Sequence, residues 1–224
     1  MILPLTCDAI LFDLDGVLID SNHIYEKQWS IWAGKRGISY PHIQKIHHGR
    51  PVTETIRIVA PHLDPYEEAE AYRDGLLASN DLEHVHAFPG VASLLNNLPP
   101  SRWAIATSAP RPSALQMLRH VALPVPNVFI SGDDIGRGKP APYPYLRAAW
   151  GLNQQIDRCV VIEDAPAGIQ SGQSAGAKVI AVQTTNHPNT LIKADLIIDT
   201  IADLHIEDAG TYLRISVNSK EVDN

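Results

Sequence analysis

Reactive side chains stand at or shortly after the ends of apolar runs in this sequence. In chain order they are Asp13 and Asp15, Thr107 and Ser108, Lys139, and Glu163 and Asp164. One carboxylate can attack phosphorus, and a second can protonate the leaving oxygen and later deprotonate the attacking water. A lysine and a hydroxyl can hold the phosphate oxygens, and carboxylate oxygens suit Mg²⁺. These residue types therefore predict phosphoryl transfer assisted by Mg²⁺.

The apolar runs themselves predict buried strands that position this chemistry. They cover residues 9–12, 103–106, 128–130, 160–162, 179–182 and 196–198. Helical periodicity lies between them, at residues 114–120, 143–150 and 165–175. Strands that alternate with helices predict an α/β fold, a doubly wound parallel sheet covered on both faces. Ligands bind at the carboxyl ends of such strands, so the reactive side chains are expected at one rim.

Residues 19–88 break this alternation, because they show helical periodicity and contain no clear buried strand. We interpret them as an inserted α-helical cap, with residues 1–18 and 89–224 forming the core. A closing cap would exclude water from the site, which suits a small phosphate ester better than a protein substrate. Near the end of the chain, apolar and polar residues alternate over 212–217, which predicts an added edge strand.

Composition excludes several classes of partner. The formal net charge of the 224 residues is −7, which argues against nucleic acid as the main ligand. The sequence has no apolar run long enough to span a membrane and no signal peptide pattern. Its two cysteines, Cys7 and Cys159, are too few for a disulfide framework. We expect a cytoplasmic protein with reduced cysteines, present as a monomer or a weak homodimer.

The motifs around these residues resemble the haloacid dehalogenase superfamily. They are Asp13-Leu14-Asp15-Gly16, Ala106-Thr107-Ser108, Arg137-Gly138-Lys139-Pro140 and Glu163-Asp164-Ala165-Pro166-Ala167-Gly168. The first motif alone is a weak signal, but four motifs in this order form a strong one. The resemblance spans about residues 8–205 and implies a Rossmann-like core with a helical cap.

The resemblance implies a role for each matched residue. Asp13 would be the nucleophile, and Asp15 the general acid and base. Thr107 and Lys139 would grip the phosphate. The implied Mg²⁺ ligands are Asp13, Asp164 and the backbone carbonyl of Asp15, with Glu163 assisting directly or through water. Related dehalogenases lack the acid at the Asp15 position, so its presence favours phosphate chemistry.

A closer resemblance, to bacterial hexitol and sugar phosphatases and to fungal 2-deoxyglucose-6-phosphate and glycerol phosphatases, points to the substrate. It includes the cap segment His47-His48-Gly49-Arg50. The substrate-binding candidates are Ser108, Arg111, Arg50 and Gly49. Arg111 can equally be a solvated surface residue, and Arg50 can have a structural role in the cap turn. The pair His47 and His48 lacks a third metal ligand at suitable spacing, so we expect packed or solvated histidines.

Three other interpretations stay open. A sugar phosphate mutase like β-phosphoglucomutase would carry a cap histidine where this sequence has Tyr25. A phospho-acceptor signalling module would place its aspartate on a later strand and would lack the insertion. A non-catalytic binding protein would not need every reactive position filled.

In the linker, Ser21 is expected to cap the first cap helix.

Overall fold

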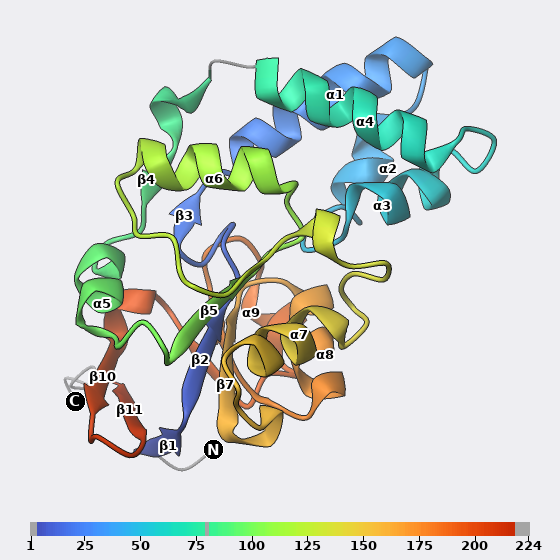
Figure 1. Cartoon of the computed structure of the whole chain (residues 1–224). Coiled ribbons are helices and arrows are strands. Elements are labelled where there is room, and N and C mark those ends of the chain that lie inside the picture. The colour runs from blue at the N-terminus through green and yellow to red at the C-terminus, as the bar shows by residue number, and fades with distance from the viewer. Residues whose placement is uncertain (1–3, 79–80, 218–224) are drawn as a thin grey trace, which may run out of the picture.

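The computed structural model describes residues 4–78 and 81–217 (Figure 1). The strands are β1 (Leu5–Cys7), β2 (Ala9–Phe12), β3 (Ile19–Asp20), β4 (His86–Ala87), β5 (Trp103–Ala106), β6 (Phe129–Ile130), β7 (Cys159–Glu163), β8 (Lys178–Val182), β9 (Leu196–Ile198), β10 (Leu204–Asp208) and β11 (Leu213–Val217). The α-helices are α1 (Asn22–Arg36), α2 (Tyr40–Gln44), α3 (Val52–Val59), α4 (Pro65–Ala78), α5 (Val91–Asn97), α6 (Arg111–His120), α7 (Tyr143–Gly151), α8 (Pro166–Ala175) and α9 (Pro188–Leu191). Short 3₁₀ turns lie at Leu82–His84, Gly132–Asp134, Ile156–Arg158 and Ile201–Asp203.

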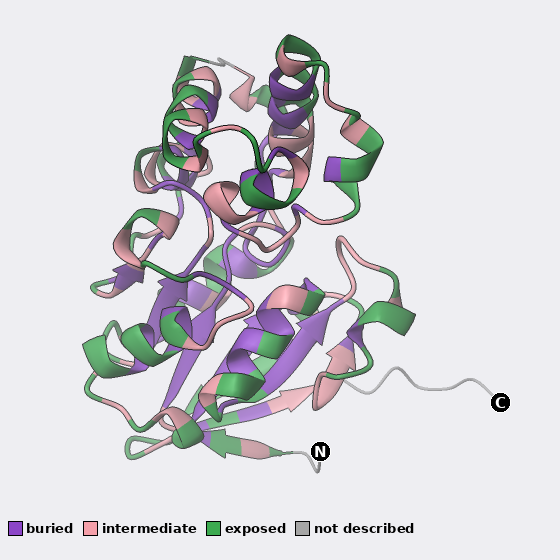
Figure 2. Ribbon diagram, turned by 90° about the vertical axis from the view of Figure 1, so that its right-hand side faces the viewer, coloured by how far each residue is buried: buried purple, intermediate pink, exposed green. Residues whose placement is uncertain are grey.

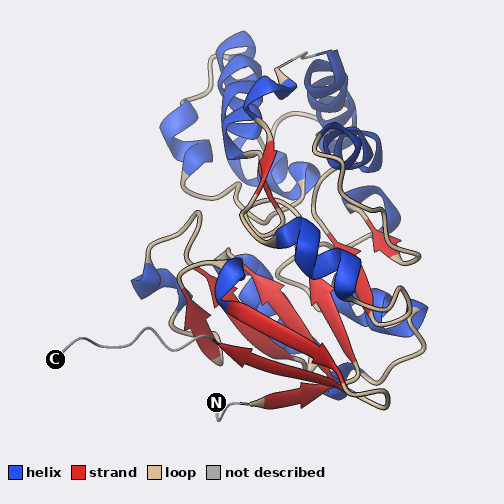
Figure 3. Ribbon diagram, turned by 90° about the vertical axis from the view of Figure 1, so that its left-hand side faces the viewer, coloured by secondary structure: helices blue, strands red, loops and turns tan. Residues whose placement is uncertain are grey.

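The main sheet is parallel and has the strand order β6-β5-β2-β7-β8-β9. It confirms the predicted doubly wound α/β core, with each predicted strand of this sheet present to within one or two residues. The runs are apolar throughout because strands between two helical layers are buried on both faces. Strand β2 lies in the middle, so its carboxyl end opens at the centre of the rim (Figure 3).

Alternate residues of the strands pack on opposite faces of this sheet. On one face Leu11, Ala104 and Val161 pack against α7, α8 and α9. On the other face Phe12 and Ile105 belong to a larger core that includes side chains of α5 and α6 and of the insertion. The central strands β5, β2 and β7 are buried along their whole length (Figure 2). Both faces therefore hold the reactive ends of the strands in a rigid frame.

Helices α1 to α4 lie together at the end of the molecule to which β2 points (Figure 1). Strands β3 and β4 pair antiparallel, Ile19 with Ala87 and Asp20 with His86, and so bring the two ends of the insertion together. Trp29, Trp32 and Tyr72 are buried between α1 and α4, and Trp29 and Tyr72 pack with ring centroids 4.4 Å apart. The division into residues 1–18, 19–88 and 89–224 stays a prediction, and residues 1–3 and 218–224 lie outside the described part.

The prediction of an edge strand over 212–217 was wrong about its neighbours. Strand β11 is the middle strand of a separate antiparallel sheet with the order β1-β11-β10. Its flanking strands were not predicted, since β1 is only three residues long and β10 is mostly exposed on one face. Cys7 is the last residue of β1. Within the described residues, no helix is long and apolar enough to cross a bilayer.

Candidate active site

The turn after β2 places Asp13 and Asp15 at the rim of the sheet. Asp13 continues the ladder, since its backbone N–H donates to the carbonyl of Ile162 at 2.9 Å. Gly16 then adopts a φ of +82°, a left-handed conformation that side chains disfavour. A Cβ atom on Gly16 would lie 2.0 Å from Oδ2 of Asp164. Glycine is therefore required both by the turn and by the close approach of Asp164.

Lys139 lies fully buried behind Asp13. Its Nζ is 2.7 Å from Oδ1 of Asp13 and 2.6 Å from Oε1 of Glu163. Burial alone would lower the pKa of Lys139, but the charges of Asp13 and Glu163 outweigh it and raise that pKa. The lysine is therefore a fixed cation beside the predicted nucleophile.

Glu163 accepts hydrogen bonds at both carboxylate oxygens. Besides Lys139, the Tyr145 hydroxyl donates to Oε1 at 2.7 Å, and the backbone N–H groups of Asp164 and Ala165 donate to Oε2 at 2.9 and 3.1 Å. Gly168 in α8 leaves the room for this carboxylate, since a Cβ there would lie 1.7 Å from Oε1. The structure thus ties Glu163 to Lys139 more closely than the sequence suggested.

Asp15 faces hydroxyl donors. Ser21 donates to its Oδ1 at 2.5 Å, and Thr107 donates to its Oδ2 at 3.1 Å. Ser21 stands at the N-cap position of α1 as expected, but its side chain makes no capping hydrogen bond. The predicted cap is therefore wrong in its contact, because the Ser21 hydroxyl donates its hydrogen bond to the buried carboxylate of Asp15 instead.

An acidic cluster opens beside Asp13. Ligand atoms of Asp13, Glu163 and Asp164 all lie within 4.8 Å of one another. Anionic oxygens gathered in this way fit a hard divalent cation such as Mg²⁺. Asp13 and Asp164 are the better placed of the three, because both oxygens of Glu163 already accept hydrogen bonds.

Burial and mutual repulsion raise the pKa values of these carboxyl groups. Burial raises the pKa of Asp13 to about 7, against the lowering effect of Lys139. Burial and the charge of Glu163 raise the pKa of Asp164 well above its usual value. Burial also raises the pKa of Asp15, although the hydroxyls of Ser21 and Thr107 oppose the shift. A proton on Asp15 is the state that the sequence led us to expect, and a cation at the cluster would favour ionised Asp13.

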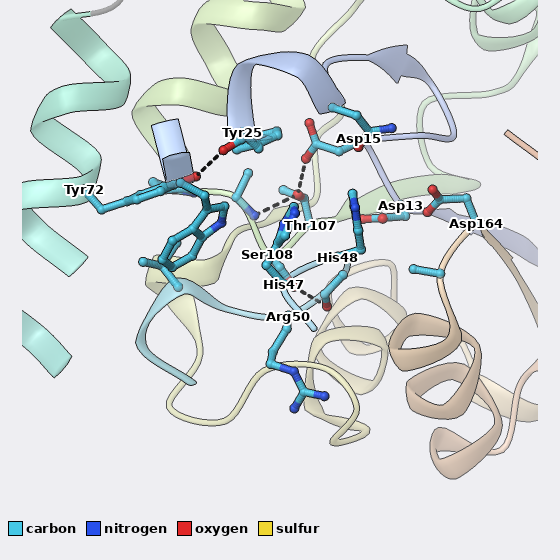
Figure 4. A pocket seen from close by; sticks show the side chains of 17 residues that line it. Asp13, Asp15, Tyr25, His47, His48, Arg50, Tyr72, Thr107, Ser108 and Asp164 are labelled. Carbon is cyan, nitrogen blue, oxygen red and sulfur yellow. Dashed lines mark hydrogen bonds between the residues drawn. The ribbon is translucent and has the colours of Figure 1, made fainter. Parts of the chain in front are cut away.

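Asp13, Asp15, Thr107 and Asp164 lie on the floor of a pocket whose roof is made by the insertion (Figure 4). Its volume, mouth included, is about 570 Å³. The lining residues are Asp13, Asp15, Asn22, Tyr25, Trp29, His47, His48, Gly49, Arg50, Val52, Tyr72, Thr107, Ser108, Ala109, Pro110, Asp164 and Ala165. The pocket therefore joins the rim of the sheet to α1, α4 and the loop between α2 and α3.

Three of the four substrate-binding candidates lie at this pocket. Ser108 donates to the carbonyl of Gly49 at 3.0 Å, which ties the rim to the α2–α3 loop. Arg50 lines the pocket but extends away from the carboxylates, and its Nε donates to the carbonyl of Ile46 at 3.2 Å (Figure 4). The structure does not bring Arg111 to the pocket, because its guanidinium pairs with Asp134 at 2.6 Å.

Sequence reasoning did not place several residues of the site. Tyr145 lies in a helix, and nothing in its spacing pointed to Glu163. Asn22 donates to Thr185 at 2.9 Å, which links the start of α1 to the loop after β8. Asn186 in the same loop donates to the carbonyl of Asp164 at 3.1 Å. A polar run after the predicted strand 179–182 was the one available signal for this loop.

Comparison with known proteins agrees with this geometry. The sequence pattern of the family "Haloacid dehalogenase-like hydrolase" matches residues 10–182. The chain is 35% identical to hexitol phosphatase A of Escherichia coli over 89% of its length and 94% of that protein. It is 33% identical to glycerol-1-phosphate phosphohydrolase 2 of Saccharomyces cerevisiae, over 82% of this chain and 77% of that one. A crystal structure of β-phosphoglucomutase from Clostridium difficile superposes with a TM-score of 0.73 at 25% identity, covering 88% of this chain and 92% of that chain.

Proposed function

The chain belongs to the haloacid dehalogenase-like hydrolase family, and we propose that it hydrolyses phosphate monoesters of small sugars or polyols. The convergence of Asp13, Asp15 and Asp164 at one pocket, with the buried Lys139 at 2.7 Å from Asp13, carries this proposal. The names of the similar proteins, which are phosphatases of hexitols and of glycerol 1-phosphate, support the substrate class. The motif resemblance named the same classes of protein.

In the first step that we propose, a carboxylate oxygen of Asp13 attacks phosphorus, and the bond from phosphorus to the leaving oxygen breaks. Asp15 gives its proton to that oxygen, so the product leaves as a neutral alcohol. The phosphate stays on Asp13 as an aspartyl-phosphate. Lys139 and Thr107 hold the phosphate oxygens as their charge redistributes. Ser21 orients Asp15 toward the leaving group.

In the second step, water attacks phosphorus while Asp15, now ionised, takes a proton from it. The bond between phosphorus and Asp13 breaks, which releases inorganic phosphate and restores both carboxyl groups. We propose that Asp13, Asp164 and the carbonyl of Asp15 hold Mg²⁺, with Glu163 behind them as the partner of Lys139. Bound Mg²⁺ would offset the repulsion between the carboxylates and the phosphate dianion.

We further propose that residues 19–88 act as the cap of the core formed by residues 1–18 and 89–224. The antiparallel pair β3 and β4 at the base of the insertion supports this division. Gly49 also supports it, since a Cβ there would lie 3.0 Å from Cβ of Ala165. This close contact between the α2–α3 loop and the core would exclude water from the pocket and leave room for a small ester.

A reducing compartment such as the cytoplasm fits the two cysteines. Cys7 and Cys159 are unpaired and buried, as predicted. Burial raises the pKa of each thiol to about 12, which makes both unreactive. We propose that the protein works there on small-molecule phosphate esters.

Isomerisation of sugar phosphates by a mutase is the second candidate function, favoured by the likeness to a β-phosphoglucomutase structure. Tyr25 weighs against it. Its hydroxyl lies 3.8 Å from Sδ of Met117 at the pocket, and the sequence resemblance implies a histidine at this position in the mutases. A phenol with a pKa raised far above 10 by burial and by Asp15 does not shuttle protons as an imidazole does.

Phosphate release from a panel of hexose, pentose, hexitol and glycerol phosphates, with and without Mg²⁺, tests the proposal. We expect fast release from one or a few members, which requires Mg²⁺ and stops with EDTA. Formation of an isomeric sugar phosphate without release would favour the mutase. A folded protein that releases phosphate from none of them would refute the phosphatase assignment.

A further inference from the structure

The roof of the pocket differs in chemistry from its floor. The floor carries the carboxyl groups of Asp13, Asp15 and Asp164. The roof carries aromatic and imidazole side chains, which are Tyr25, Trp29, Tyr72, His47 and His48. Aromatic rings offer a flat apolar surface with a few polar atoms, which suits the mixed C–H and O–H surface of a polyol.

His47 is a buried polar side chain of the roof. Only 6% of its surface is exposed. Its ring lies 6.1 Å from that of Trp29 and 4.0 Å from that of His48, measured between centroids. Its Nε2 is buried and has no hydrogen-bond partner among the described residues. A buried polar atom without a partner is destabilising, so its presence at a pocket indicates a partner on the ligand.

The charge around His47 sets what that partner can be. Burial, followed by the neighbouring His48, lowers the pKa of His47 to about 3, so its ring is neutral at physiological pH. Glu26 is the acidic group that faces His48, at 4.0 Å. Arg50 lines the pocket, but its guanidinium is directed to the Ile46 carbonyl. Among the described residues, the roof near His47 therefore has no cation directed at the ligand, while the floor carries three carboxyl groups.

We propose that His47 is a specificity-determining residue, whose Nε2 hydrogen-bonds a hydroxyl of an uncharged, polyhydroxylated leaving group packed against Trp29. The inference rests on the proposed phosphatase function and narrows its substrate class. Leaving groups with a carboxylate have no cation directed at them from the described part of the roof. A leaving group that has no hydroxyl besides its ester oxygen, as in p-nitrophenyl phosphate, leaves Nε2 of His47 unpaired in the complex, as it is in the free protein.

The test compares His47→Phe with the wild type on sorbitol 6-phosphate, glycerol 1-phosphate, 2-phosphoglycolate and p-nitrophenyl phosphate. Phenylalanine keeps the ring and removes both nitrogens. We expect kcat/KM for the better of the two polyol phosphates to fall about 10- to 100-fold, the range for a lost buried hydrogen bond. The value for p-nitrophenyl phosphate should stay within about twofold, since no hydrogen bond to Nε2 is lost.

Two further variants and one stability measurement separate specificity from a structural role. His47→Gln keeps a hydrogen-bonding group and should recover part of the polyol activity. His42→Phe makes the same change at an exposed site in α2 and should leave all activities unchanged. The Tm of His47→Phe without substrate should equal or exceed that of the wild type, because an unpaired buried nitrogen has been removed.

Each outcome bears on one claim. A wild type that cleaves p-nitrophenyl phosphate and both polyol phosphates keeps the proposed function, whatever the variant does. Equal losses on polyol and aryl phosphates, or no loss on either, would overturn the role of His47. Faster wild-type turnover of 2-phosphoglycolate than of the polyol phosphates would overturn the substrate class. A wild type inactive on all four would instead refute the phosphatase function.

Discussion

Replacing Lys139 by methionine removes the one cation that the structure places between Asp13 and Glu163. Methionine has a similar length and no charge, so the change removes the ammonium group with little change in volume. The two ion pairs that it breaks measure 2.7 and 2.6 Å, and the lysine is fully buried. Removing one partner of a buried pair costs about 3–5 kcal/mol, because the remaining charge is left uncompensated.

For a protein of this length, that loss corresponds to a fall in Tm of about 6–20 °C, at roughly 2–4 °C per kcal/mol. The loss should depend on pH. Without the ammonium group, the pKa of Asp13 rises beyond about 7, so the folded variant takes up protons that the unfolded chain does not. The deficit relative to the wild type is therefore largest above pH 8 and shrinks as the pH falls.

Thermal unfolding followed by circular dichroism between pH 5 and pH 9, with EDTA present, measures this deficit. Lys178→Met is the matched control, since it breaks an exposed pair with Asp195 at 3.0 Å and should cost at most about 1 kcal/mol. Equal Tm values for the two variants at pH 8, or a deficit for Lys139→Met that grows as the pH falls, would refute this reasoning.

Three other substitutions test neighbouring parts of the site. Gly16→Ala forces a left-handed alanine against Asp164, so the free energy of unfolding should fall by about 1–2 kcal/mol. The Mg²⁺ concentration for half-maximal activity should rise, and an unchanged Mg²⁺ dependence would contradict this. Arg50→Ala removes the hydrogen bond from Nε to the Ile46 carbonyl in the α2–α3 loop, so kcat/KM for sugar and aryl phosphates should fall together, by up to about tenfold; a loss confined to the sugar phosphates would contradict this. Tyr145→Phe should lower the free energy of unfolding by about 1–3 kcal/mol, since Glu163 loses a buried donor, and should also lower kcat. Wild-type stability together with wild-type kcat would show that the hydroxyl is dispensable.

The main sheet was predictable because its strands carry their own signal. Residues 9–12 and 103–106 are apolar without interruption, as is typical of strands buried on both faces. The small sheet gave no such signal, since β1 is short and β10 alternates weakly. Its order, with β11 in the middle, depends on pairing between residues 5–7 and 213–217, which spacing along the chain does not reveal.

The site was predictable where a residue follows a strand directly. Asp13 and Thr107 lie at the ends of their strands, and a parallel sheet brings such ends together. Arg111 follows the same strand as Thr107, but α6 begins there and turns the side chain toward Asp134. The first residues of a helix can point to either side of the rim, and the sequence alone does not decide which.

The roof of the pocket was the least predictable part. Trp29, His47 and Tyr72 come from three separate segments of the insertion, and their meeting depends on how α1, α2 and α4 pack. No short motif fixes that packing. Ser21 shows the same limit, because its position fitted a helix cap and only the folded chain shows Asp15 beside it.

The most direct test of the central claim is to look for phosphate on Asp13. The protein is mixed with Mg²⁺ and a hexitol phosphate carrying labelled phosphate, quenched in acid within one turnover, and the label on the protein is measured. The account predicts label on the wild type and on the exposed control Asp157→Asn, but none on Asp13→Asn, whose kcat should fall by at least about a thousandfold. Near-normal turnover by Asp13→Asn, or label on that variant equal to the wild type, would contradict the account.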